Sequence, residues 1–366
     1  MNQQTPMPPR SAQRSAARTP KNKKKGVRWG RIIFSFVALI IVILAAYVCY
    51  LYFGVYKNNV DKIADQDPTA TPIPKEQRAD VKPVALVLLG LDYRKQLGSM
   101  NTDVVMVAAF NPKTKTATVV SIPRDSDLKL EGYKRHKVNA YYANFEAYAR
   151  KTEGLEGEAA KDYARDHVRE MLGKFFDIDI DYTTVIDFQG FIDVVDALGG
   201  VEVDVDKDMR YVDNADGTNI NLTAGQQTLD GEDALGFVRY RKSNRGTAAS
   251  SDFERNERQS QVLGAMVDRI KSFGTITKID NLMNAVGDNM RTDIPKSQID
   301  AMIKTYFGSI SRSNIRFIPL EGEWISPYVV LNKEKLAEAK QALAEELSSS
   351  GRAAATPSAS PEASGK

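Results

Sequence analysis

The fold is decided by VALVLLGLDYR at residues 84–94, followed by TDVVMVAAFNP at 102–112 and KTATVVSIPRD at 115–125. Each stretch has a run rich in Val, Ile or Leu between turn-forming residues, which is typical of adjacent, mostly buried strands. Asn111-Pro112-Lys113 predicts a tight turn, and therefore a hairpin of the second and third strands. If the first two strands are antiparallel as well, the three charged strand ends share one edge of a sheet.

Two kinds of charge lie at this shared edge. The acids are Asp92, Asp103 and Asp125, and the guanidiniums are Arg94 and Arg124. Carboxylates beside guanidiniums suit a metal ion together with a phosphate-type anion. The alternative is that charged residues end these strands simply because strands end at the surface, and this stretch alone favours neither.

The composition describes a folded protein with an uneven charge distribution. Of 366 residues, 42% are hydrophobic and 27% are charged, enough for one large domain or two small ones. Residues 1–31 carry nine Lys or Arg and no acid, so subtracting nine from the net charge of +3 leaves −6 for the rest. The body of the chain therefore gives no indication of nucleic-acid binding.

Composition also predicts how the chain is divided. Residues 32–53 are apolar and uncharged, long enough for a transmembrane helix, and the basic residues 1–31 keep the N-terminus in the cytoplasm. A cleaved signal peptide is the alternative, but no small-x-small site follows Phe53. We expect a single-pass protein of the cell membrane with an extracytoplasmic linker at 54–82, a catalytic domain at 83–347 and a disordered tail at 348–366.

Periodicity within 83–347 predicts an α/β fold. Helical spacing favours helices at 137–150, 158–176, 191–198, 230–239, 251–273 and 333–347. Further strands are expected at 181–188, 201–205 and 315–319, and a polar loop at 206–218. Because the domain opens with a hairpin, we expect a mixed central β-sheet flanked by helices and preceded by one transmembrane helix.

Several kinds of site are disfavoured. The chain has two histidines, His136 and His167, without metal-ligand spacing, and its single cysteine, Cys49, lies in the apolar span. The sequence has no GxSxG, Walker A or GxGxxG motif. The acids of 206–216 lack the register of a calcium loop. Histidine-based hydrolases, zinc enzymes and common nucleotide-binding folds are therefore not expected.

What remains is a chemistry of arginine and aspartate. Five arginines occur within twenty residues: Arg239, Arg241, Arg245, Arg255 and Arg258. A guanidinium is a planar fork that holds phosphate oxygens in pairs. The plainer alternative is that nearby acids such as Glu254 neutralise them, and that a cation such as Arg239 is favourable at a helix C-terminus.

With both clusters in view, the chain resembles the LytR-CpsA-Psr family of Gram-positive cell-wall enzymes from about Val84 to Leu347. Seven stretches match in the family's order: LLGLDYR (88–94), NTD through NP (101–112), SIPRD (121–125), KVNAYY (137–142), DFQGFIDVVDALGGV (187–201), LDGEDALGFVRYR (229–241) and DFERNERQSQVL (252–263). Val104, Phe237 and Ser260 depart from residues common in the family, and none of these departures removes a charge.

The resemblance implies a phosphotransferase that uses Mg²⁺ and buries a lipid chain in an apolar pocket between sheet and helices. By position, it implies Asp92 and Asp103 as metal ligands, and catalytic roles for Asp103, Asp92, Arg124 and Arg239. It also implies a group of side chains around the substrate pyrophosphate: Arg94, Arg124, Arg239, Arg241, Arg255, Arg258 and Gln259.

We therefore expect a membrane-anchored, Mg²⁺-dependent ligase. Its donor would be a glycopolymer of teichoic acid, capsule or arabinogalactan type on a polyprenyl pyrophosphate, and its acceptor peptidoglycan, with the cytoplasmic membrane as a further partner and no nucleic acid. Two alternatives stay open: a polyprenyl pyrophosphate hydrolase, and a non-catalytic lipid-binding or regulatory protein of the cell envelope. Phosphoryl transfer fits these residues because it needs positioning and charge neutralisation more than covalent participation.

Overall fold

The structure, a computed structural model, describes residues 73–94, 99–214, 217–272, 287, 289–306, 309 and 311–351. The chain divides into residues 1–50 and 51–366, and everything described belongs to the second unit. The predicted basic tail and membrane anchor lie outside the described residues, as do most of the linker and of the C-terminal tail. Of the helices in the described ranges, none is both long and apolar enough to cross a bilayer.

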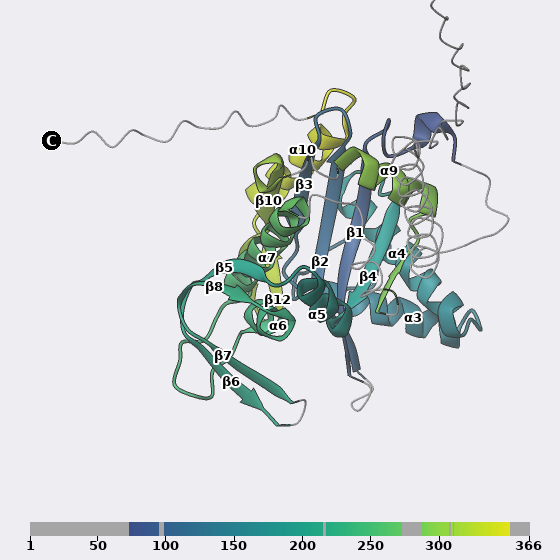
Figure 1. The fold of residues 1–366 in the computed structure, drawn as a ribbon. Coiled ribbons are helices and arrows are strands. Elements are labelled where there is room, and N and C mark those ends of the chain that lie inside the picture. The colour runs from purple at the N-terminus through teal and green to yellow at the C-terminus, as the bar shows by residue number, and fades with distance from the viewer. Residues whose placement is uncertain are drawn as a thin grey trace, which may run out of the picture. The chain divides into compact units, whose positions relative to one another are not determined.

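A six-stranded mixed sheet forms the centre of the second unit (Figure 1). Its strands, in the order β10-β3-β2-β1-β4-β9, are Ile315–Pro319, Thr116–Ser121, Ser99–Asn111, Val84–Arg94, Tyr182–Asp187 and Met290–Thr292. The pairs β1–β2, β2–β3 and β4–β9 are antiparallel, whereas β1–β4 and β3–β10 are parallel. The predicted mixed sheet and its opening hairpin are confirmed.

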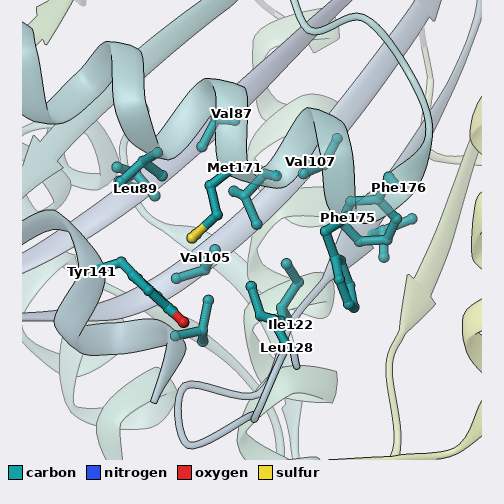
Figure 2. Close-up of a cluster of buried hydrophobic side chains, with 14 of the residues drawn as sticks. Val87, Leu89, Val105, Val107, Ile122, Leu128, Tyr141, Met171, Phe175 and Phe176 are labelled. Carbon is teal, nitrogen blue, oxygen red and sulfur yellow. The ribbon is translucent and has the colours of Figure 1, made fainter. Parts of the chain in front are cut away.

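One face of the sheet, which we call the α4 face, carries Val87, Leu89, Val105 and Val107. Helices α3 (Tyr141–Lys151), α4 (Gly157–Phe176) and α10 (Lys333–Leu347) cover it. Figure 2 shows Met171, Phe175 and Phe176 of α4 among these strand residues. Because side chains alternate along a strand, the residues between them point to the opposite face.

That opposite face, the α7 face, carries Leu88, Met106 and Ala108. Helices α5 (Phe188–Ala197), α6 (Gly231–Arg239) and α7 (Asp252–Ser272) lie together in front of it in Figure 1. The remaining elements are short: η2 (Lys75–Gln77), η3 (Val138–Ala140), α9 (Lys296–Tyr306), η4 (Arg312–Asn314), and the pairs β5–β8 (Val201–Val205, Gly225–Leu229) and β11–β12 (Gly322–Ile325, Tyr328–Leu331).

Two predicted helix starts are confirmed by their caps. Asp230 accepts a hydrogen bond from the backbone N–H of Asp233 and begins α6. Ser251 and Glu254 form a capping box at α7: the Glu254 N–H donates to Ser251 Oγ, and the Ser251 N–H donates to Glu254 Oε2. The helix predicted at 191–198 begins earlier, because Asp187 caps it by accepting from the Gly190 N–H.

The prediction of a polar loop at 206–218 is wrong. Strands β6 (Met209–Asp213) and β7 (Thr218–Leu222) form a hairpin that projects away from the sheet in Figure 1. Its buried side chains, Met209, Ile220 and Leu222, are spread over two short stretches of mostly polar residues. Half-exposed strands of this length show too little apolar alternation to be recognised from sequence.

Candidate active site

A β-bulge brings Asp103 onto the α7 face. In the β1–β2 register Gly90 pairs with Val104 and Leu91 with Thr102, so Asp103 is the extra residue of β2. Strict alternation from Val105 would point Asp103 to the α4 face, yet Asp103 and Val104 line the same cavity. The bulge also explains the glycine: a Cβ on Gly90 would lie 2.9 Å from the Cβ of Val104.

The cavity lies between the α7 face and helices α5, α6 and α7, where the resemblance implies a lipid pocket. Its volume is about 240 Å³. Apart from Gly90, its lining is apolar except for five polar residues: Asp103, Asp187, Arg239, Arg255 and Gln259.

The polar and apolar parts of this lining are separated along the elements. In α7, Arg255 and Gln259 occupy the first turns, and Val262 and Met266 follow. Between Arg255 and Met266 the helix rises about 16 Å at 1.5 Å per residue. The cavity therefore has a charged end beside the N-terminus of α7 and an apolar end further along the helix.

Arg124 and Asp125 follow β3 and lie against the charged end. Arg124 Nη1 donates to Asp103 Oδ1 at 2.8 Å. The Asp125 carboxylate is nearly buried and lies among three cations: Lys137 Nζ at 2.9 Å, and Arg124 Nε and Arg241 Nη2 both at 3.9 Å. Asp125 therefore concentrates positive charge beside Asp103.

Two arginines of the predicted set line the cavity. The Arg239 guanidinium lies 4.3 Å from the centre of the Phe188 ring, in a cation–π arrangement that fixes its position. Arg255 is 3% exposed, and Gln259, one helical turn later, is 7% exposed. The α6 C-terminus and the α7 N-terminus thus bring three members of the implied pyrophosphate group, Arg239, Arg255 and Gln259, to one cavity.

Arg258 is placed differently. Its Nε and Nη2 donate to the two carboxylate oxygens of Asp206 at 2.7 and 2.8 Å, and further hydrogen bonds reach Tyr240 O and Ser250 Oγ. Burial raises the pKa of Asp206, but the hydrogen bonds and charge of Arg258 outweigh burial and hold that pKa below its usual range. Arg258 therefore joins α7 to the segment between β5 and β6 and does not line the cavity.

The two predicted metal ligands lie on neighbouring strands. Asp92 is buried and follows Leu88 and Gly90 on the α7 face, which Asp103 reaches through the bulge. Within the described ranges, no cluster of three or more His, Cys, Asp or Glu side chains is arranged to hold a metal ion. Two carboxylates fit Mg²⁺, which commonly takes one or two protein carboxylates and completes its shell with water and substrate phosphates.

Arg94 and the two histidines were also considered from the sequence. Arg94 is the last residue of β1 and pairs in register with Ser99. His167 stacks on the Tyr163 ring at 3.7 Å, and His136 meets Tyr141 edge-on. Sequence reasoning assigned no role to Lys137 or Asp187, although both stand in stretches that carry the resemblance.

Comparisons with known proteins identify the family of this chain. The model of the LytR_cpsA_psr family matches residues 49–346. The Polyisoprenyl-teichoic acid–peptidoglycan teichoic acid transferase TagT of Bacillus subtilis (strain 168) is 31% identical over 342 residues, which cover 89% of this chain and 97% of the relative.

Solved structures share the fold. The crystal structure of B. subtilis TagV, 28% identical, covers 73% of this chain and 97% of its own, with a TM-score of 0.56. A structure of TagT bound to LI-WTA, 26% identical, covers 77% of this chain and 95% of its own, with a TM-score of 0.53. The predicted mixed α/β architecture is thus shared with relatives over most of their length.

Proposed function

Because the chain belongs to the LytR-CpsA-Psr family, we propose that it transfers a glycopolymer from a polyprenyl pyrophosphate carrier to peptidoglycan through a phosphodiester bond. The observation that carries the proposal is the cavity with a charged end and an apolar end. A polyprenyl pyrophosphate has the same division, since its pyrophosphate is anionic and its chain is a hydrocarbon. The relative TagT is named as a teichoic acid transferase, which makes teichoic acid the first donor to test.

The charged end binds and orients the donor. Arg239 and Arg255 supply paired N–H donors for pyrophosphate oxygens, and Gln259 adds an amide donor. The apolar end takes the first part of the lipid chain. At about 240 Å³, the cavity is smaller than the ~300–1,000 Å³ typical of ligand pockets. The flexible side chains Met106, Met266 and Met290 line it and permit adjustment to a longer chain.

The reaction is a displacement at the phosphorus that carries the glycan. An acceptor hydroxyl oxygen forms a bond to this phosphorus and gives its proton to the Asp103 carboxylate. The bond from phosphorus to the bridging oxygen breaks, and polyprenyl phosphate leaves. Arg124 holds Asp103 by the 2.8 Å hydrogen bond, while Arg239 and Arg255 stabilise the negative charge that develops on the phosphate oxygens.

A divalent cation fits this scheme. Asp92 and Asp103 would hold Mg²⁺, which supplies charge neutralisation at the pyrophosphate when bound. The predicted membrane anchor at 32–53 belongs to the same proposal. A lipid-linked donor stays in the bilayer, so an extracytoplasmic catalytic domain has to remain beside the membrane.

The test uses the full chain in detergent with a short polyprenyl-pyrophosphoryl oligosaccharide and peptidoglycan, in Mg²⁺ or EDTA. Mass spectrometry looks for glycan joined to peptidoglycan by a phosphodiester. We expect a Mg²⁺-dependent adduct that Asp103→Ala and Arg124→Ala abolish. Asp166→Ala, which removes an exposed acid on α4, is the matched control. Polyprenyl phosphate released without adduct would indicate hydrolysis instead, and intact donor despite tight binding would indicate a lipid-binding protein.

A further inference from the structure

An exposed aromatic side chain stands beside the candidate active site. Trp324 and Ile325, at the tip of the β11–β12 hairpin, are 52% and 53% exposed. Among the described residues only two other large hydrophobic side chains, Val81 and Tyr148, are comparably exposed. A tryptophan exposed beside proposed reacting groups is a candidate contact residue, because Trp is enriched at binding interfaces.

The hairpin is fixed to the loop that carries Arg124 and Asp125. The Val329 N–H donates to Asp125 O at 2.9 Å, and the Asp127 N–H donates to Val329 O at 3.0 Å. The Arg135 guanidinium, held by Asp127, lies 4.4 Å from the centre of the Tyr328 ring. The exposed ring therefore keeps a set position relative to Arg124.

Lys137 connects the ring to the charged end of the cavity. Its Nζ lies 5.3 Å from the centre of the Trp324 ring and 2.9 Å from Asp125 Oδ1. Asp125 in turn neighbours Arg124, which binds Asp103. Three side chains thus separate the exposed ring from the proposed proton acceptor, and Lys137 approaches the ring while about half of the Trp324 surface stays open.

We propose that the β11–β12 hairpin docks the acceptor, with the Trp324 ring stacking on a hexosamine ring of the peptidoglycan strand. This inference rests on the proposed transfer function. The axial C–H bonds of a pyranose are weakly positive and meet the negative face of an indole ring. Stacking at Trp324 would hold one sugar of the strand so that a neighbouring hydroxyl reaches the phosphorus.

The surroundings favour a glycan over a lipid surface. Only two adjacent apolar side chains are exposed here, and Glu323 precedes them in the same strand. So small an apolar patch offers little area for insertion into a bilayer, because interfacial binding strengthens with the apolar area that is buried. Arg135 beside Tyr328 and Lys137 beside Trp324 suit a glycan that bears acidic stem peptides.

A kinetic test separates the two substrates. In the full-chain transfer assay, Trp324→Ala should raise the KM for peptidoglycan about tenfold, equivalent to about 1.4 kcal/mol, and leave donor affinity unchanged. Trp324→Phe, which keeps an aromatic face, should recover most of this loss. Tyr148→Ala, which removes an exposed aromatic on α3, should have no effect. An unchanged acceptor KM in Trp324→Ala would overturn the inference while leaving the transfer function intact.

A spectroscopic test needs no turnover. The chain has two tryptophans, Trp29 and Trp324, so Trp29→Phe makes Trp324 the sole indole reporter. In detergent, a soluble tetrasaccharide of N-acetylglucosamine and N-acetylmuramic acid should change its fluorescence saturably, even in an inactive Asp103→Ala chain. The opposing result is fluorescence that the saccharide leaves unchanged, with emission that shifts to the blue in phosphatidylglycerol vesicles relative to phosphatidylcholine vesicles. That result would assign the hairpin to the membrane surface. Saccharide binding by a wild-type chain that transfers nothing would support the hairpin assignment and contradict the proposed function.

Discussion

Asp103 and Arg124 lie 21 residues apart and meet at 2.8 Å, because the bulge in β2 turns the acid toward the end of β3. The bulge and the hairpin therefore act together to place a carboxylate and a guanidinium at the charged end of one cavity. A proton acceptor held by a guanidinium from the loop after β3 needs little reorganisation when substrate binds.

Replacing the acid by its neutral isostere tests this pair. Asp103→Asn keeps the shape of the side chain and removes the proton acceptor, so kcat should fall about 10²–10⁴-fold. The donor Kd should change far less, because Arg239 and Arg255 are intact. Single-turnover kinetics with equilibrium donor binding measures both quantities. A kcat within a few-fold of wild type would remove Asp103 from the proposed mechanism.

Arg258 and Arg255 stand three residues apart in α7 and should respond differently to substitution. Arg258→Ala breaks the bidentate bond to Asp206 and should lower the free energy of unfolding by about 2–3 kcal/mol. This loss is smaller than the loss for a fully buried ion pair, because Asp206 is partly exposed. Arg255→Ala should chiefly weaken donor binding. Urea unfolding beside donor titration compares them. A loss of donor affinity without loss of stability in Arg258→Ala would instead support a direct pyrophosphate contact.

Gly90 should tolerate no side chain while Val104 lies opposite it. In Gly90→Ala the new Cβ would meet the Val104 Cβ at 2.9 Å, and we expect a cost of about 1–3 kcal/mol in unfolding free energy. The strands must separate, which displaces Asp103 and lowers kcat as well. The double variant Gly90→Ala/Val104→Gly removes the opposing Cβ and should recover part of both losses. No recovery would mean that steric conflict is not the cause.

Filling the apolar end of the cavity should block the lipid chain. Leu263 lines the cavity from α7 and is partly buried, so Leu263→Trp should raise the donor Kd at least tenfold for a long polyprenyl chain. A donor analogue with a very short chain should lose less affinity. Leu336→Trp, an enlargement against the α4 face, controls for general overpacking. Equal losses for long and short chains would contradict a lipid-binding role for the cavity.

The capping box of α7 should make stability depend on pH. Burial raises the pKa of Glu254, but hydrogen bonds from Lys207 and Ser251 outweigh burial and lower that pKa from 4.5 to about 2. A depressed pKa means that the folded state favours the charged form, so this contribution is complete above about pH 4.5 and is lost as the pH falls toward 2. Urea unfolding of wild type and Glu254→Gln should therefore differ at pH 6 and converge near pH 2–3. A constant difference would exclude the carboxylate charge as its source.

Local sequence patterns predicted the main strands and helices of this fold, but they did not predict which distant residues pair with one another. The apolar runs of β1, β2 and β3 and the helical spacing of α6 and α7 were visible because each depends on neighbouring residues. The bulge at Asp103 was hidden, since it depends on how two strands align. The partnership of Arg258 with Asp206 spans 52 residues, so no local pattern distinguishes Arg258 from Arg255.

The cations around Asp125 are another contact within the site that local sequence patterns could not predict. SIPRD and KVNAYY were both recognisable, but their meeting at the 2.9 Å bond between Lys137 and Asp125 depends on how the loop after β3 folds against η3. The Val138 N–H donates to Ser126 O and the Asn139 N–H to Arg124 O, which joins the two stretches. The motifs identified the stretches that contain Asp125 and Lys137, but only the tertiary hydrogen bonds between the two stretches bring them into contact.

The order of strands in the sheet has a consequence for how the chain is made. Strands β1, β2 and β3 come early, whereas the strands that flank the finished sheet, β9 and β10, come from residues 290–319. Until β10 is synthesised, β3, whose six residues are all buried in the finished fold, remains an open edge with unpaired backbone groups. A chain interrupted before Ile315 thus exposes an unpaired strand edge to which neighbouring chains can bind, and this edge is covered only when the last seventh of the protein is made.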